Sequence, residues 1–491
     1  MKNRQAVLAL DQGSSSSRAL AFDGRGRALS RAQFKVRARY PRPGWVEHDA
    51  VELASSLERA MDAALDALPR STEVAAVGIS CQRSTVVLWD SATGRPVCPA
   101  PSWQDARAAG WVGALAADGG LRDRVHAKTG LYLNPFYSAP KVRWLLETNA
   151  AARALAAKGR LRVGPVSSFV LWRLTKGEVF RADPTMAQRT LLYNLAKGDW
   201  DEELLELFGV GRASLPVVGP TTGDWAQLVR RGRRLRVTAV LGDQQAAALG
   251  QGADRPGAGV LNFGTGAFFL LNTGARLARV PGLLTSAAWQ REGRPGGYFL
   301  EGTVHAAGTS LDWLNRRLGV LSDPRKAGAA CRRSRRRILA LPAIGGLGAP
   351  RWDYRTPTVF WGLASDSSPD DMVRGIVEGL GFLLADGVVA ARKAGYPAET
   401  LRAGGGLARL DHLVQFTADI LQRPVLRLEE SEATALGAAA LAAQAAGMPW
   451  TGARASGRVF KPRMKAGEAA RLHRNWDEFV AAQQALAAKL L

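Results

Sequence analysis

The chain opens with two short apolar runs separated by a polar turn. Residues 6–10 (AVLAL) and 19–23 (ALAFD) flank the stretch DQGSSSSR at 11–18. Apolar runs bounded by Gly, Ser and Asp residues are typical of strands joined by a tight turn. Since apolar strands flank it on both sides, the serine tract is not a flexible linker. The pattern predicts a strand–turn–strand unit with its turn at Gly13.

The segment 44–68 has the spacing of an amphipathic helix. Asp49 is a residue type preferred at a helix N-cap, and Pro69 ends the pattern. The apolar positions recur every three or four residues and share one face: Leu53, Leu57, Met61, Leu65 and Leu68. The sequence therefore predicts a helix that begins after Asp49 and buries this face.

The same periodicity, together with Gly and Pro breakers, predicts the other elements. Strands are expected at residues 73–80, 85–90 and 235–241, and at 401–408 as a strand that ends in a glycine turn. Helices are expected at residues 141–157, 201–208, 242–251, 311–318, 370–395 and 433–447.

After residue 252 the opening plan begins again. Residues 259–274, GVLNFGTGAFFLLNTG, form a second strand–glycine turn–strand pattern. Two halves that each start in this way indicate duplicated α/β domains with a cleft between them. We expect one domain at residues 1–252 and the other at 253–491.

Composition indicates an ordinary globular protein. The 491 residues are 47% hydrophobic and 22% charged. Three scattered cysteines without a Cys-x-x-Cys pair favour a reducing, cytoplasmic setting. The first apolar run ends at Asp11, too early for a signal peptide, and no apolar stretch is long enough to span a bilayer. We expect a soluble protein with no membrane partner.

The net charge of +23 raises the question of a nucleic-acid partner. Two basic runs support that reading, RRGRRLR at 230–236 and RRSRRR at 332–337. No RNP pattern, zinc finger or basic zipper accompanies them, and solvated surface segments have the same composition. We therefore do not expect nucleic acid to be the main partner. The same positive potential would also attract an acidic small molecule such as a nucleotide.

The turn between the first two strands carries groups suited to binding an anion. A glycine permits the turn, and three serines and an arginine supply donors: Gly13, Ser14, Ser15, Ser16 and Arg18. A surface hairpin without a ligand is compatible with the same spacing, which does not decide between the two. The turns FGTG at 263–266 and AGGG at 403–406 repeat the pattern.

Asp243 directly follows an apolar strand and begins a predicted helix. An aspartate in this place is often a helix cap. It also stands at the carboxyl end of a strand, where open α/β sheets bind ligands. There a carboxylate can take a proton from a hydroxyl or hold a metal through water.

The order of motifs is more specific than any one of them. Ten segments follow one another: ALDQGSSSSRALAFD (9–23), GWVEHD (44–49), WQDAR (103–107), LGDQQAAALGQ (241–251), FGTG (263–266), EGTVHAAGTSLDWL (301–314), GGLGAPRWD (345–353), GGLARLDHLVQFTADIL (405–421), EATALGAA (432–439) and FKPRM (460–464). Over nearly the whole chain this series resembles the FGGY family of carbohydrate kinases, and within it the branch of glycerol kinases.

The resemblance implies two actin-like, RNase-H-like domains around a ligand cleft. It also implies ATP-dependent phosphorylation of a polyol or sugar hydroxyl, with glycerol, converted to glycerol 3-phosphate, as first candidate. Asp243 is then the general base, and Asp11 and Asp243 lie at the Mg²⁺. The implied nucleotide contacts are Ser14, Ser15, Ser16, Arg18, Thr265, Gly266, Gly308, Asp312, Gly406 and Leu410. The implied acceptor contacts are Arg83, Ser84, Trp103, Phe136, Asp243, Gln244 and Phe268.

Two acceptor positions depart from the family's pattern. Its Arg-Glu pair appears as Arg83-Ser84, so a short uncharged side chain replaces a carboxylate that accepts hydrogen bonds from glycerol. Its DPYFS reads NPFYS at 134–138, which places Phe136 where a tyrosine hydroxyl is expected. Each lost partner costs about 1–3 kcal/mol of binding free energy. Three nucleotide-side positions also differ: Gly404 for an aspartate, Leu410 for an asparagine and Asp312 for a glutamine.

These departures keep two other hypotheses open. One is a kinase for a different polyol or ketose, and the other is a non-catalytic, regulatory relative that binds nucleotide or sugar. Retention of Asp243 argues against the second, because a cleft that only binds has no use for a base. The sequence leaves open whether the protein is a monomer or a homo-oligomer.

Overall fold

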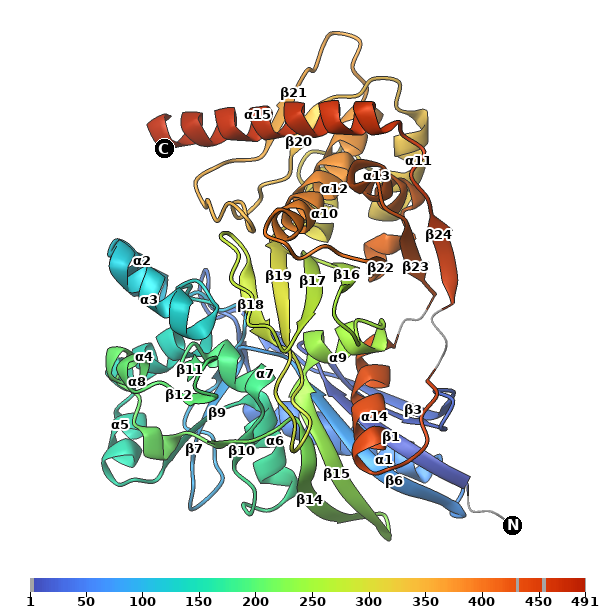
Figure 1. Cartoon of the computed structure of the whole chain (residues 1–491). Coiled ribbons are helices and arrows are strands. Elements are labelled where there is room, and N and C mark those ends of the chain that lie inside the picture. The colour runs from blue at the N-terminus through green and yellow to red at the C-terminus, as the bar shows by residue number, and fades with distance from the viewer. Residues whose placement is uncertain (1–3, 430–431, 453–455, 491) are drawn as a thin grey trace. The chain divides into compact units, whose positions relative to one another are not determined.

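The computed structural model describes residues 4–429, 432–452 and 456–490. The chain forms two compact units, each with a large mixed sheet (Figure 1). Unit 1 comprises Met1–Gly250, Ser286–Tyr298 and Glu432–Arg454, and unit 2 comprises Gln251–Thr285, Phe299–Ser431 and Ala455–Leu491. Unit 1 therefore takes two segments from beyond residue 252, and the division of function between 1–252 and 253–491 stays a prediction.

The sheet of unit 1 is built around a central strand with parallel neighbours on both sides. Its order is β14 (Thr222–Arg230), β15 (Arg233–Gly242), β6 (Thr72–Cys81), β1 (Arg4–Gln12), β2 (Ser16–Phe22) and β3 (Ala28–Lys35). β6 runs parallel to β1 and β15, and the outer pairs are antiparallel. Asp11 and Leu241 both pair with Ser80 in register, so the chain places Asp243 just beyond the same edge. The opening strand–turn–strand prediction is confirmed.

The amphipathic helix predicted after Asp49 is α1 (Ala50–Asp66). Asp49 Oδ1 accepts hydrogen bonds from the backbone N–H groups of Val51 and Glu52, so the N-cap is confirmed. All five residues of the apolar face are buried in the core of unit 1, where α1 packs against β2 and β3.

α9 (Asp243–Gly250) and α14 (Ala433–Ala445) are distant in the sequence and pack against each other in unit 1. α14 also contacts β1 and β6 (Figure 1). A Cβ at Gly437 would lie 1.8 Å from the Ala246 carbonyl oxygen. The glycine is therefore required for this backbone approach, which fixes the helix that begins at Asp243.

The remaining elements of unit 1 surround this sheet. Its other strands are β4 (Ala38–Arg39), β5 (Glu47–His48), β7 (Val86–Asp90), β8 (Ala100–Pro101), β9 (Leu161–Pro165), β10 (Arg181–Ala182), β11 (Tyr193–Asn194), β12 (Asp199–Trp200) and β13 (Val217–Val218). Its other helices are α2 (Ala109–Ala116), α3 (Gly119–Thr129), α4 (Ser138–Thr148), α5 (Ala150–Ala157), α6 (Val166–Leu174), α7 (Pro184–Ala187) and α8 (Glu202–Phe208). The single helix expected at 141–157 is wrong: Asn149 ends α4, and its side chain accepts from the Ala152 N–H to cap α5.

The second sheet repeats the plan of the first. Its order is β18 (Leu284–Ala287), β19 (Tyr298–Val304), β17 (Ala267–Gly274), β16 (Ala258–Phe263), β22 (Thr400–Gly404), β23 (Val425–Leu428) and β24 (Gly457–Phe460). β16 pairs antiparallel with β17 and parallel with β22, which places Asn262 opposite Gly404. The second strand–turn–strand unit is thus confirmed.

The core of unit 2 centres on α12 (Pro369–Lys393). The other elements of this unit are α10 (Gly308–Arg316), α11 (Ala327–Arg333), α13 (Asp411–Leu421), α15 (Ala466–Leu490), β20 (Leu339–Leu341) and β21 (Val359–Trp361). Within the described ranges, no helix combines the length and apolarity needed to cross a bilayer.

Both basic runs are engaged by acidic side chains of their own unit. In unit 1 the pairs are Arg230 with Glu58 and Asp62, and Arg231 with Asp62 and Asp66. In unit 2 they are Arg333 with Asp370, Arg336 with Asp366, and Arg337 with Glu378. These pairs offset part of the charge of both runs; that nucleic acid is not the main partner stays a prediction.

Candidate active site

Asp11 occupies the carboxyl edge of the unit 1 sheet, at the end of β1. Its carboxylate is 3% exposed. Ser80 Oγ donates to Asp11 Oδ1 at 3.1 Å, and Arg18 Nη2 pairs with Asp11 Oδ2 at 2.9 Å. Burial nevertheless raises the pKa of Asp11, since the loss of hydration outweighs the guanidinium. The site therefore holds a carboxylate that gains from further positive charge.

Asp243 is the first residue of α9, at the same edge. Its Oδ1 accepts from the Gln244 N–H at 2.7 Å, rather than from an amide deeper in the helix as an ordinary cap does. Burial raises the pKa of Asp243 to about 6; Arg83 and Arg189 lower it, and the negative charge of Asp11 raises it. Arg83 Nε lies 3.7 Å from Asp243 Oδ1. A carboxylate with this pKa is ionised at neutral pH and can accept a proton from a hydroxyl.

A buried polar network that sequence reasoning missed supports Asp243. Thr185 Oγ1 accepts from the Gly242 N–H at 2.7 Å, and Thr185 and Thr221 donate to Asp183. Burial raises the pKa of Asp183 to about 6. The Asp-Pro pair that caps α7 is a recognisable sequence signal for this network. The network fixes the backbone immediately before the proposed base.

Arg189 is a second residue that the motifs did not reveal. It is 4% exposed, and its Nη2 donates to Ser286 Oγ at 2.6 Å. Its positive charge lowers the pKa of Asp243. The arrangement keeps two guanidiniums near the proposed base, which is the polarity needed beside a phosphoryl group that is being transferred.

The expected acceptor residues of unit 1 lie on four separate segments. Ser84 follows β6 in a left-handed backbone conformation, with φ of 63°. Trp103 and Phe136 are each 39% exposed, and Gln244 is partly buried. The Phe136 N–H donates to Asn134 Oδ1 at 2.9 Å. Residues 134–138 therefore form a turn that leads into α4 rather than an extended strand.

The segment that carries Trp103 is held by a buried ion-pair cluster. Arg107 Nε pairs with Asp105 Oδ1 at 2.8 Å, and Arg107 Nη2 pairs with Glu47 Oε1 at 2.7 Å. The guanidinium also lies 4.1 Å from the centroid of the Trp45 ring. These contacts explain the motifs GWVEHD and WQDAR as one structural unit rather than as two sites.

The serine turn lies between β1 and β2. Gly13 N–H donates to the Ser16 carbonyl at 3.0 Å, and the Ser15 carbonyl accepts from the Val36 N–H at 2.9 Å. Ser14, Ser15 and Ser16 are exposed or partly exposed, whereas the fourth serine is buried against α1. The first three thus remain accessible to an anion, and their contact with nucleotide stays a prediction.

Arg18 already has two carboxylate partners in the structure. Besides Asp11 it pairs with Glu432 at 3.1 Å, and Glu432 also pairs with Arg31. The guanidinium is 30% exposed. The expected contact of Arg18 with nucleotide therefore requires a guanidinium N–H that is not already bonded to Asp11 or Glu432.

In unit 2 the structure brings three of the predicted nucleotide positions together. Thr265 and Gly266 lie in the turn between β16 and β17. Gly308 begins α10, and its N–H donates to the Gly264 carbonyl at 3.0 Å. A Cβ at Gly308 would lie 3.0 Å from that same oxygen. The glycine therefore lets the N-terminus of α10 dock on the turn, a geometry suited to an anion.

The other predicted positions of unit 2 range from exposed to buried. Gly406 is exposed and follows β22, which pairs with β16 beside the same turn. Asp312 is exposed on α10, and Phe268 is partly buried opposite Asn262. Leu410 is 9% exposed and packs in the hydrophobic core. Their contacts with nucleotide or acceptor stay predictions.

The chemistry of Asp11 and Asp243 fits a magnesium ion. Mg²⁺ binds one or two carboxylates together with phosphate oxygens and water. Asp11 raises the pKa of Asp243, which shows that the two carboxylates repel each other. A divalent cation would relieve this repulsion, so both residues are suitable ligands.

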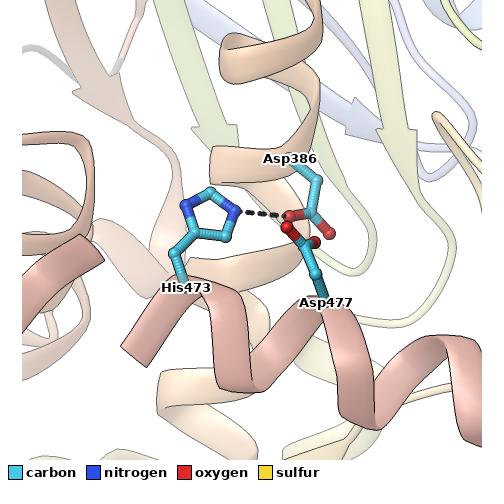
Figure 2. Close-up of side chains that lie close together, drawn as sticks. All are labelled: Asp386, His473 and Asp477. Atoms are coloured by element: carbon cyan, nitrogen blue, oxygen red, sulfur yellow. Dashed lines mark hydrogen bonds and ion pairs between the residues drawn. The ribbon is translucent and has the colours of Figure 1, made fainter. Parts of the chain in front are cut away.

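A second acidic cluster, in unit 2, has a structural explanation. Asp386 of α12 faces His473 and Asp477 of α15 (Figure 2). His473 Nε2 lies 3.1 Å from Asp386 Oδ1, within hydrogen-bond distance. Arg351 pairs with both aspartates, and Trp476 Nε1 donates to Asp386 at 3.0 Å. Because a guanidinium already balances the carboxylates, the cluster fastens α15 to α12.

Comparison with known proteins gives one consistent result. Residues 6–250 match the N-terminal domain of the FGGY family of carbohydrate kinases, and residues 259–446 match its C-terminal domain. The chain is 39% identical over 489 residues to a glycerol kinase of Alkalilimnicola ehrlichii, covering 97% of this chain and 98% of that protein. It is 42% identical over 443 residues to a glycerol kinase of Thermus brockianus, covering 88% of each.

Solved structures agree. A Plasmodium falciparum glycerol kinase with ADP superposes with a TM-score of 0.91 at 26% identity, covering 98% of both chains. A xylulose kinase from Brucella ovis superposes with a TM-score of 0.87 at 23% identity, covering 98% of this chain and 100% of that one. The predicted α/β fold of two actin-like domains is confirmed.

Proposed function

The chain belongs to the FGGY family of carbohydrate kinases, and from this premise we propose that it transfers the γ-phosphoryl group of ATP to a hydroxyl of glycerol. The observation that carries the proposal is Asp243, an accessible carboxylate beside Asp11 and Arg83. It occurs in a chain about 40% identical to glycerol kinases over nearly its full length. It is an enzyme, a phosphotransferase with an alcohol group as acceptor, and the non-catalytic hypothesis is set aside.

In the proposed mechanism Asp243 accepts the proton of the attacking hydroxyl. A carboxylate contributes about 10²–10⁴-fold to such a step when it is held within hydrogen-bond reach. Arg83 holds the ionised form and orients it, and the network around Thr185 fixes the preceding backbone. Mg²⁺, held through Asp11 and Asp243, would neutralise charge on the phosphate oxygens.

The phosphates of ATP are assigned to the two glycine-containing turns. Ser14, Ser15 and Ser16 offer accessible hydroxyls and N–H groups in unit 1. Thr265 and Gly266, with the N-terminus of α10, offer a second set in unit 2. Phosphoryl transfer depends on positioning and charge neutralisation, which these groups supply.

The second candidate is a kinase for a different polyol or a ketose. Ser84 and Phe136 favour it, because both remove polar partners that the glycerol kinase branch uses, while Arg83 and Trp103 are retained. An acceptor with another arrangement of hydroxyls then binds better than glycerol.

The test is ADP release with MgATP and a panel of glycerol, pentitols, ketoses and hexoses. We expect glycerol to support turnover well above that of Asp243→Asn. A ketose or pentitol with the highest kcat/KM establishes the second candidate. If no acceptor raises turnover above the Asp243→Asn level, the kinase proposal fails.

A further inference from the structure

Lys141 is a buried lysine of α4 whose ammonium group bonds to backbone carbonyl oxygens. Its side chain is 0% exposed. Nζ donates to three backbone carbonyl oxygens: Ser84 at 2.9 Å, Ser102 at 2.8 Å and Phe136 at 2.8 Å. An ammonium has three donors and no acceptor, so this geometry satisfies it completely. Among the described residues, no carboxylate lies within ion-pairing distance of Nζ.

The three carbonyls belong to three of the four segments that carry the expected acceptor contacts of unit 1; the fourth is the start of α9, with Asp243 and Gln244. Ser84 is itself one of these positions, and its neighbour is Arg83. Ser102 immediately precedes Trp103, and Phe136 is the third. These segments are far apart in the sequence. The Trp103 N–H donates to Thr85 Oγ1 at 3.1 Å and Ser138 Oγ donates to the Ser84 carbonyl, so each of these bonds joins two segments, whereas the ammonium of Lys141 joins all three.

The Ser84 segment has particular need of such support. Its φ of 63° lies in the left-handed region, which L residues other than glycine, asparagine and aspartate seldom adopt. Two donors hold its carbonyl, Lys141 Nζ and Ser138 Oγ at 3.2 Å. Both come from the first turn of α4, so this helix sets the orientation of the Ser84 peptide and therefore of Arg83.

We propose that Lys141 is a positioning residue for the acceptor, which fixes the segments of Ser84, Trp103 and Phe136 relative to one another through the backbone carbonyls of Ser84, Ser102 and Phe136. The inference rests on the proposed function, because it is that function which assigns these segments to the acceptor. Lys141 does not touch the acceptor or Asp243. It acts through the directions in which Arg83, Trp103 and Phe136 point.

The test compares Lys141→Met with Ser138→Ala and with the matched control Lys128→Met. Lys128 is a partly exposed lysine of unit 1 that pairs with Asp201. Met is unbranched and only one heavy atom shorter than lysine, and it removes the three donors. Hydrogen exchange is followed on peptides covering 82–85, 102–105 and 134–138, and KM for glycerol is measured beside the Kd for ADP.

Lys141→Met is expected to raise exchange in all three peptides together and to raise KM for glycerol about tenfold or more. The Kd for ADP should stay unchanged. Ser138→Ala is expected to raise exchange at 82–85 only. Lys128→Met should leave all three peptides and KM as in the wild type.

Two results overturn the proposal. One is unchanged exchange in the three peptides of Lys141→Met. The other is a uniform rise in exchange throughout unit 1, with glycerol and nucleotide affinity lost alike, which indicates a general folding role. If the wild type phosphorylates no acceptor, the proposed function fails separately, and the exchange measurement still decides whether Lys141 fixes these segments.

Discussion

Replacing Ser84 by glutamate should restore affinity for glycerol. The substitution returns a carboxylate to the position beside Arg83 where the glycerol kinase branch of the family carries one. Backbone strain is not an obstacle, since Ser84 already adopts φ of 63° and glutamate pays the same penalty as serine there. The carbonyl of residue 84 keeps its bonds to Lys141 and Ser138, because these involve the backbone.

The magnitude follows from the hydrogen bonds that the new side chain accepts. A hydrogen bond to a charged group contributes about 1.5–3 kcal/mol. At about 1.4 kcal/mol per tenfold change, Ser84→Glu should lower KM for glycerol about 10- to 100-fold. Ser84→Gln has the same length without the charge, and a neutral hydrogen bond of about 0.5–1.5 kcal/mol should lower KM only about two- to tenfold.

The assay is coupled ADP release at saturating MgATP with glycerol varied. Thermal unfolding of each variant checks that the substitution at this buried position leaves the fold intact. A KM for glycerol in folded Ser84→Glu that equals or exceeds the wild-type value would be inconsistent with this prediction. The acceptor site would then not place residue 84 against the glycerol hydroxyls.

Other predictions concern pH, the nucleotide turn, packing and the metal. Burial and the charge of Arg107 lower the pKa of Lys141 to about 7, against the opposing charge of Asp105, and a neutral amine has one donor fewer. KM for glycerol should therefore rise as the pH passes upward through about 7, while KM for ATP does not follow. Between about pH 7 and the ordinary lysine pKa of 10.5, the unfolded chain binds one more proton at this group than the folded chain does. The group should therefore make the free energy of unfolding increase with pH within that range, as measured by urea unfolding. Gly308→Ala should raise KM for ATP several-fold, because its Cβ would meet the Gly264 carbonyl at 3.0 Å, and an unchanged KM argues against this turn as a phosphate site. Gly437→Ala should lower the free energy of unfolding by about 1–3 kcal/mol or more through overpacking, which a urea midpoint equal to that of the wild type would contradict. Removal of Mg²⁺ with EDTA should abolish ADP release, and full activity without a divalent cation would contradict the assignment of Asp11 and Asp243.

The elements that the sequence predicts well are those with strong local signals. Asp49 as a cap, the apolar face of α1 and the two glycine turns are all read from residues close together in the chain. The chain order of motifs then identified the family. Asp243 was placed correctly at the end of a strand because strand, glycine and helix follow one another directly.

What local pattern could not provide is contact across long sequence separations. Lys141 looks like an ordinary helical lysine, and its burial depends on carbonyls that come from three distant segments. Asp183 and Arg189 are similar: Asp183 acts on the backbone before Asp243 through Thr185 and the Gly242 N–H, and Arg189 acts on Asp243 through its charge, both across more than fifty residues of sequence. The alanine-rich α14 gives no sign in its sequence that it packs against α9.

If Asp243 acts as the base in phosphoryl transfer, its loss must appear in kcat, so kcat of Asp243→Asn is the decisive measurement. Asparagine preserves the shape of the side chain and would serve equally well as a helix cap. With saturating MgATP and the best acceptor of the panel, we expect kcat to fall about 10²–10⁴-fold while ADP binding is retained. A variant that keeps more than about a tenth of the wild-type kcat would show that Asp243 is not the base, because a loss of less than about tenfold is smaller than the least contribution expected of a general base, about 10²-fold.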